Sequence, residues 1–179
     1  MSWHFSHRPS NRFLHLISVM PASDWFVKNR RAVIERAAWL KSKADGVLCE
    51  KQFSFSRIAI QKSGDLIRMC FIDPAGVRDE LTWSGAVLDL NDPLDLSPTP
   101  YNQAFMLALL WRSQPRRIYV AGFGGGRVPL VLHHHFRQAI IDSAEIDVVV
   151  SGLGQTYFAI SNDSRQRVHI VDARSTSKA

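Results

Sequence analysis

Two clusters of residues that could do chemistry lie side by side between Tyr119 and Phe136. The first has four glycines within five residues, at 122 and 124–126, and the second is three consecutive histidines at 133–135. A glycine-rich turn lets the backbone pass close beneath a phosphate or a nucleoside. Histidine is the commonest metal ligand. The spacing within each cluster decides which chemistry the sequence can support.

The three histidines do not have the spacing of a metal site. They fall in a predicted helix, where successive side chains point about 100° apart. Chelating pairs need residues three or four apart on one helix face. His133, His134 and His135 are therefore predicted to be solvated or to lie at the edge of the core, and no metal is expected.

The glycines have the better spacing for a ligand. Gly122, Gly124 and Gly126 directly follow a strand predicted at 118–121 and open the next helix. A dinucleotide loop of the form GxGxxG would place its third glycine at position 127, which is Arg127. The observed GxGxG favours an adenosyl ligand, such as the amino-acid portion of S-adenosylmethionine, although many glycine-rich segments are only tight turns.

Two carboxylates are predicted at the same edge of the sheet as the glycines. Glu145 lies 23 residues after Gly122, at the end of the next strand, and could accept both ribose hydroxyls. Asp172 ends a third strand and could accept a hydrogen bond from an adenine amino group. Ligands of open α/β sheets bind at the carboxyl ends of strands. The alternatives are a surface carboxylate for Glu145 and a helix N-cap for Asp172.

The elements that must position these residues fall into two regions. Strand-like stretches at 53–60, 66–72 and 85–90, with a turn at 63–65, predict a small antiparallel sheet. Beyond Pro98 and Pro100, residues 101–111 read as a buried helix. Strands and helices then alternate as βαβαβ, which predicts an α/β fold with a parallel sheet. The strands are expected at 116–122, 139–147 and 167–173, and the helices at 126–136 and 148–160.

The positive charge lies entirely at the beginning of the chain. Residues 1–43 have eight Lys and Arg against two Asp and Glu, whereas residues 44–179 have fourteen of each. Residues 1–45 are therefore predicted to be a basic N-terminal extension with one amphipathic helix at 27–41. Its apolar side, a candidate docking face, consists of Val33, Ile34, Ala37 and Leu40. The balanced main body makes nucleic acid an unlikely partner.

Other classes of protein are also disfavoured by the composition. No apolar run approaches the roughly 20 residues of a membrane span, so no membrane partner is expected. The two cysteines, Cys49 and Cys70, form no CxxC pair, which fits a reducing compartment and predicts a cytoplasmic protein.

Residues 53–174 resemble the spermidine synthase (polyamine aminopropyltransferase) family, especially its bacterial spermidine-synthase-like members. The resemblance rests on the order and spacing of GAVLDLNDP, YNQAFMLALLW, PRRIYVAGFGGG, AEIDVVV and RVHIVDAR. It implies a small antiparallel β-domain at 46–98, followed at 99–179 by the first half of a methyltransferase-like Rossmann domain. It also implies decarboxylated S-adenosylmethionine, or S-adenosylmethionine, as co-substrate, with an aminopropyl group passing to a polyamine. No permanently bound cofactor is implied.

The resemblance also assigns roles to individual residues. The three alternating glycines would form the nucleoside loop, with Glu145 on the ribose and Asp172 on the adenine. Tyr101 and Gln103 would belong to the substrate site. Ordinary methyltransferases usually have an acid two residues before the first glycine, where this chain has Val120.

The departures from the family are as informative as the matches. Synthases have an aspartate inside the glycine loop, where this chain has Gly125, and a His-Glu pair after the tyrosine, where it has Asn102 and Gln103. The family's catalytic aspartate lies on a fourth strand beyond Asp172, so the sequence reads as a C-terminally truncated relative.

The expected consequence is an edge strand at 118–121 with an uncovered apolar surface. We therefore expect a chain that is marginally stable, aggregation-prone or dependent on a partner, forming a homo-oligomer or another complex through that edge. Two alternatives stay open. One is a non-catalytic binding or oligomerisation module, and the other is a relative of the S-adenosylmethionine-dependent methyltransferases.

Overall fold

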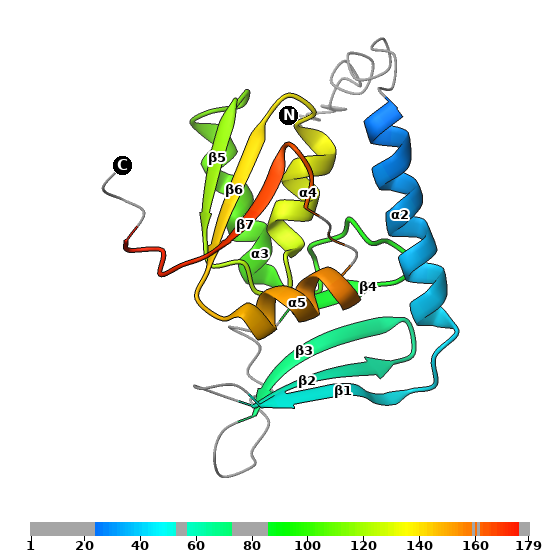
Figure 1. The fold of residues 1–179 in the computed structure, drawn as a ribbon. Coiled ribbons are helices and arrows are strands. Elements are labelled where there is room, and N and C mark those ends of the chain that lie inside the picture. Colours follow the sequence, from blue (N-terminus) through cyan, green and yellow to red (C-terminus); the bar gives the residue numbers. More distant parts are fainter. Residues whose placement is uncertain (1–23, 53–56, 73–85, 159, 161, 176–179) are drawn as a thin grey trace, which may run out of the picture.

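The chain forms two sheets with helices packed between and beside them (Figure 1). The computed structural model describes residues 24–52, 57–72, 86–158, 160 and 162–175. The first sheet is antiparallel with the order β1-β2-β3-β4. Its strands are β1 (Gly46–Gln52), β2 (Arg57–Ser63), β3 (Leu66–Ile72) and β4 (Ala86–Asp89). Gly64 has a φ of +57°, and it makes the predicted turn between β2 and β3.

The second sheet is parallel and has the order β5-β6-β7. Its strands are β5 (Arg117–Ala121), β6 (Ile140–Glu145) and β7 (Gln166–Ile170). The connecting helices are α4 (Arg127–His135) and α5 (Val148–Tyr157). The predicted α/β fold is therefore confirmed, with a βαβαβ unit after a small antiparallel sheet.

One core joins the two sheets. Helix α5 lies over the antiparallel sheet, and Val150, Leu153 and Phe158 share a buried cluster with the strand residues Ile58, Ile60, Ile67, Met69 and Leu88. A second cluster lies behind β5 and β6, where Val120 and Ile141 meet Val128 and Leu132 of α4. The parallel sheet is thus held on the antiparallel one through α5.

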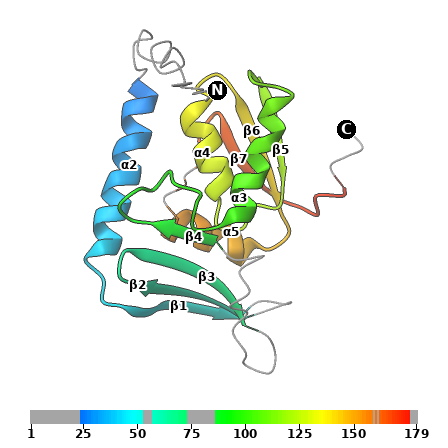
Figure 2. The ribbon, with the colours of Figure 1, turned by 180° about the vertical axis from the view of Figure 1, so that it is seen from behind.

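Helix α2 (Asp24–Lys41) runs along the side of the molecule (Figures 1 and 2). Ala37 and Leu40 join the core of the antiparallel sheet, and Val33 packs in a cluster with Phe123 of the glycine loop. Ile34, predicted on the same side, is instead 57% exposed. The correction follows from helix geometry, because 33, 37 and 40 share one face and 34 points about 100° away from 33.

The antiparallel sheet has one strand that the sequence did not predict. β1 lies at an edge and is mostly exposed, so its residues lack a regular apolar alternation. The strand expected at 53–60 is β2, which extends to Ser63, and residues 53–56 lie outside the described residues.

The buried helix predicted at 101–111 is wrong in two respects. It divides into α3 (Pro100–Phe105) and a 3₁₀ helix, η1 (Met106–Leu110). Residues three apart eclipse one another in a 3₁₀ helix, so only Met106 and Leu109 pack on the core. The large apolar residues that remain exposed are Tyr101, Phe105, Leu107, Leu110 and Trp111.

The uncovered face of the parallel sheet carries both polar and aromatic side chains. Helices α3 and α4 lie on one face only (Figure 1). On the other face Asp142 lies 2.8 Å from Arg167 and 2.9 Å from His169, and Tyr119, in register with Asp142, is 49% exposed. Further exposed apolar side chains lie on α3 and η1. None of the described helices is long and apolar enough to cross a membrane.

Candidate functional site

A cavity of about 550 Å³ lies at the carboxyl ends of β5 and β6. Residues from five parts of the fold line it: Phe71 and Ala86; Tyr101, Asn102 and Phe105; Val120 and Gly122–Gly125; Arg127, Val128 and Pro129; and Glu145, Ile146, Asp147 and Val150. Its volume is in the range of small-molecule sites. Its position is the one at which open α/β sheets bind ligands.

The three predicted glycines form the turn between β5 and α4. Gly122, Gly124 and Gly126 have φ values of +87°, +54° and +68°, a region that side-chain-bearing residues rarely adopt. Gly122 and Gly124 line the cavity, whereas Gly126 is the N-cap residue of α4. The alternation of glycines thus corresponds to three left-handed positions in one loop.

Gly125 is required by packing rather than by its backbone angle. A Cβ atom at this position would lie 2.3 Å from the Cβ of Ala86 in β4. The antiparallel sheet therefore leaves no room for a side chain here. This contact gives a physical reason for a glycine at position 125.

Glu145 connects the cavity to the loop above it. Its Oε2 accepts hydrogen bonds from the backbone N–H groups of Phe123 (3.2 Å) and Gly124 (3.0 Å). Its Oε1 accepts one from the N–H of Asp147 at 3.0 Å. The side chain is 9% exposed. An ionised carboxylate has about four acceptor positions, so one remains for a ligand.

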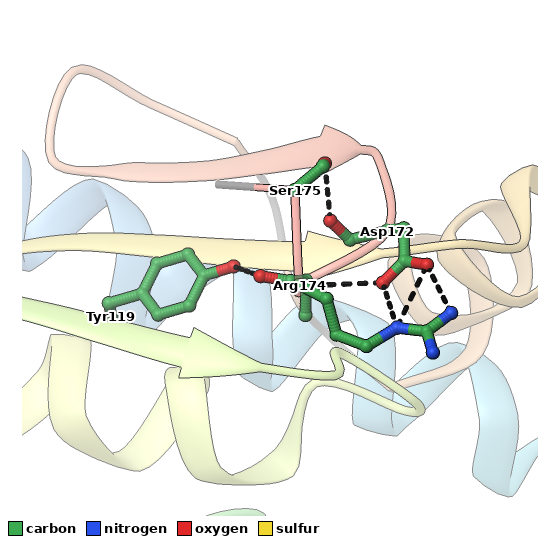
Figure 3. Close-up of polar contacts among 5 residues, drawn as sticks. Tyr119, Asp172, Arg174 and Ser175 are labelled. Atoms are coloured by element: carbon green, nitrogen blue, oxygen red, sulfur yellow. Dashed lines mark hydrogen bonds and ion pairs between the residues drawn. The ribbon is translucent and has the colours of Figure 1, made fainter. Parts of the chain in front are cut away.

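Asp172 follows β7 and forms an ion pair with Arg174, two residues further along the chain (Figure 3). The Nη2 of Arg174 lies 2.6 Å from Asp172 Oδ2, and the backbone N–H of Arg174 donates to Oδ1 at 2.9 Å. These hydrogen bonds, first from the side chain and then from the backbone, hold the pKa of Asp172 at about 2. Asp172 is not among the residues that line the cavity.

Of the two predicted substrate residues, one lines the cavity and the other does not. Tyr101 lines the cavity and stands edge-on to Phe105, with ring centroids 4.9 Å apart. Gln103 is exposed and is not part of the lining. Asn102, between them, is the one buried residue of α3 and does line the cavity. The burial of Asn102 could not be predicted, because the helix period alone does not show which side of α3 faces inward.

Arg127 is a second residue that the sequence analysis missed. Its side chain is 2% exposed, although arginine is rarely buried without a partner. Its Nε donates to the carbonyl of Val87 (3.1 Å), and its Nη2 donates to that of Asp95 (2.9 Å). Burial lowers the pKa of Arg127 to about 10. The residue ties β4 and the following loop to the start of α4.

The three histidines at 133–135 differ in how deeply their side chains are buried. His133 is 1% exposed, so the prediction of a solvated or core-edge residue is wrong for it. Its Nε2 lies 2.9 Å from Asp163 Oδ2. His134 is half-buried and His135 exposed, as the 100° rotation requires. No group of three metal-binding side chains occurs in the part of the chain that the structure describes.

The stability of the protein is expected to fall as the pH drops from about 6.5 to 4. Burial lowers the pKa of His133 from 6.5 to about 4, so the unfolded chain binds a proton that the folded chain resists. The expected loss in the free energy of unfolding is about 3 kcal/mol at most. Urea unfolding at several pH values measures it. His133→Gln should reduce the slope in this window without abolishing it, because burial also lowers the pKa of His134 to about 4. An unfolding midpoint that stays constant between pH 7 and 4.5 would contradict the assignment.

Comparison with known proteins supports the resemblance read from the sequence. No protein-family model matches the chain. The chain is 39% identical over 75 residues to a polyamine aminopropyltransferase of Vibrio vulnificus (strain CMCP6), a match that covers 42% of this chain and 25% of that protein. It is 40% identical over 58 residues to the human eEF1A lysine and N-terminal methyltransferase, covering 32% of this chain and 8% of that protein.

A solved structure agrees at the level of the fold. A probable spermidine synthase from Corynebacterium glutamicum ATCC 13032 superposes with a TM-score of 0.51 at 18% identity, over 77% of this chain and 48% of that one. The protein is thus Rossmann-like. It resembles the polyamine aminopropyltransferases, and it is also similar to a protein methyltransferase. The matched segments span a quarter or less of these two curated relatives.

Proposed function

We propose that the chain binds an S-adenosyl nucleoside in the cavity at the ends of β5 and β6. The observation that carries the proposal is the contact between Glu145 and the glycine loop. It holds an acceptor carboxylate and a left-handed glycine turn against one cavity of about 550 Å³. The candidate ligands are decarboxylated S-adenosylmethionine, S-adenosylmethionine and methylthioadenosine.

Individual residues take the roles that the family resemblance implies. Glu145 accepts a ribose hydroxyl at its remaining acceptor position. Asp172, at the end of the strand beside β6, contacts the adenine amino group after it exchanges the Arg174 pair for the ligand. Tyr101 and Gln103 lie toward the acceptor substrate. Cys49 and Cys70 are not joined in a disulfide, and a cytoplasmic location is part of the proposal.

Transfer chemistry belongs to the same proposal. In aminopropyl transfer an amine attacks the carbon beside the sulfonium, the C–S bond breaks, and methylthioadenosine leaves while a base takes the amine proton. Transfer of this kind needs a base for the amine proton, and the proposal assigns that base to no described residue. The part of the chain described here would then supply nucleoside binding and orientation.

Calorimetric titration with the three nucleosides tests the binding proposal. We expect at least one of them to bind with one site per chain. The binding proposal is rejected if none of the three nucleosides gives heat or competes with another for the protein, provided that the same protein unfolds cooperatively. Asp172→Asn tests the proposed contact between Asp172 and the adenine. This variant should bind every adenosyl ligand more weakly, and by the same factor.

The exposed apolar surface of η1 favours a second function, that of an oligomerisation module. Leu107, Leu110 and Trp111 are 56%, 79% and 84% exposed. The same 3₁₀ helix packs through Met106 and Leu109 on the cluster that contains Val120 of β5. Among the described strands, β5 pairs only with β6. A strand at the edge of a sheet is a ready template for another chain.

Substituting this surface should change the oligomeric state. We expect the wild-type chain to sediment as an oligomer and the double substitution Leu110→Glu, Trp111→Glu to sediment as a monomer. Ile34→Glu is the matched control, because Ile34 is an apolar residue of α2 that is also exposed, at 57%. A wild-type monomer with a cooperative unfolding transition would contradict this second function.

A further inference from the structure

One part of the cavity is built from groups that favour an anion. It lies between α3 and the first turn of α4, two elements that pack together (Figure 2). Arg127, Val128 and Asn102 all line the cavity there. Three independent features of these residues agree on the charge of the ligand.

The first feature is a buried cation with an unused donor. The two hydrogen-bond acceptors of Arg127 are carbonyl oxygens, and among the described residues the guanidinium forms no ion pair. Asp89, Asp92 and Asp95 act on its charge only through space. Its Nη1 is buried and has no hydrogen-bond partner in this part of the chain. A buried donor without an acceptor is costly, and an anion in the adjoining cavity would supply a charged acceptor.

The second feature is an unused amide. The side chain of Asn102 is more than nine-tenths buried, with 7% exposure, and it lines the cavity. It makes no hydrogen bond to any described residue. Buried amides are normally hydrogen-bonded. Asn102 is therefore placed to donate its N–H₂ to a ligand.

The third feature is the uncapped start of α4. The helix has nine residues, and its N-cap Gly126 has no side chain to cap it. The backbone N–H groups of Arg127 and Val128 have no acceptor among the described residues. The amino-terminal end of a helix carries a partial positive charge and free donors, which suit an anion.

We propose that this end of the cavity binds the carboxylate of an amino-acid tail, so that the site prefers S-adenosylmethionine over its decarboxylated form. The proposal rests on the adenosyl site proposed above and deepens it. Asn102 Nδ2 and the Val128 N–H donate to the carboxylate, and Arg127 supplies the positive field. The decarboxylated ligand ends in an ammonium group alone, which Arg127 repels. Asn102 is then the residue that determines specificity.

The test compares three ligands that share the adenosyl group. S-adenosylmethionine has the carboxylate, its decarboxylated form has only the ammonium, and methylthioadenosine has neither. For the wild-type protein we expect S-adenosylmethionine to bind about tenfold or more tightly than either of the others, as charge-assisted hydrogen bonds would give. Decarboxylated S-adenosylmethionine should bind no better than methylthioadenosine.

Two substitutions of one residue sharpen the test. Asn102→Ala should remove most of the preference for S-adenosylmethionine and leave the Kd of methylthioadenosine within about twofold. Asn102→Asp has the same shape but replaces a neutral amide with a negative charge, and should favour the decarboxylated ligand. Arg127→Met could unfold the protein because Arg127 also holds β4, so the Asn102 pair is the primary measurement.

The outcomes separate the two proposals. Equal or tighter binding of the decarboxylated ligand by the wild-type protein, with methylthioadenosine also bound, overturns the carboxylate subsite and leaves the adenosyl site intact. An unchanged preference in both Asn102 variants overturns the role of Asn102. If none of the three ligands binds to folded protein, both proposals fail.

Discussion

Replacing Glu145 with glutamine is expected to weaken the binding of adenosyl nucleosides strongly. The two carboxylate oxygens accept three backbone N–H groups, from Phe123, Gly124 and Asp147. Glutamine keeps one oxygen, and its N–H₂ group would face a backbone donor on the other side. We expect about 100-fold weaker binding, together with a loss of about 1–3 kcal/mol in the free energy of unfolding. Calorimetry and urea unfolding measure the two effects.

Asp142→Asn is the matched control for Glu145→Gln. Asp142 lies on the same strand, but its carboxylate pairs with Arg167 and His169 on the uncovered face of the sheet. It is not part of the cavity lining. The substitution removes the same charge and should leave the Kd within about twofold, because exposed ion pairs contribute little. If Glu145→Gln binds the nucleosides with wild-type affinity, the proposed contact between Glu145 and the ribose is wrong.

Gly154→Ala is expected to displace the glycine loop from the other side. A Cβ at this position in α5 would lie 2.7 Å from the ring of Phe123 and 2.9 Å from the backbone oxygen of Gly124. Because a backbone atom cannot swing aside as a side chain can, we expect a loss of about 1–3 kcal/mol in the free energy of unfolding. Ligand binding should weaken as well, since the loop moves.

Gly152→Ala, two residues earlier in the same helix, provides the comparison. No atom lies within 4 Å of the Cβ it would add. Alanine is the better helix former by about 1 kcal/mol, so this variant should be slightly more stable than the wild type. If thermal melts show Gly154→Ala to be as stable as Gly152→Ala, the close packing of α5 on the loop is not present in solution.

The sequence predicted the parts of the fold in which periodicity and burial agree. Apolar runs that follow turns correctly predicted β5, β6 and β7. The spacing of Gly122, Gly124 and Gly126 correctly located the loop in which each of these glycines has a positive φ. Edge strand β1 was missed because an exposed strand has no core to impose an alternation on its residues. The 101–111 segment was misread because hydrophobicity does not show whether a neighbouring element covers it.

The site could be predicted only in part for a related reason. Strand topology placed Glu145 and Asp172 at the ends of adjacent strands, as observed. Topology does not reveal that Glu145 turns to the loop while Asp172 pairs with Arg174. Arg127 and Asn102 are polar, and no sequence pattern indicates that their side chains are buried. Their burial arises from the packing of β4 and α3 against the start of α4.

Amide NMR of the protein labelled with ¹⁵N-glycine tests the central claim most directly. Methylthioadenosine is added stepwise, because it carries the adenosyl group that all the candidate ligands share. We predict saturable shifts of the Gly122 and Gly124 signals, while Gly64, in the turn between β2 and β3, stays unchanged. Shifts confined to glycines outside the loop, or no shifts at all in folded protein, would contradict an adenosyl site at the ends of β5 and β6.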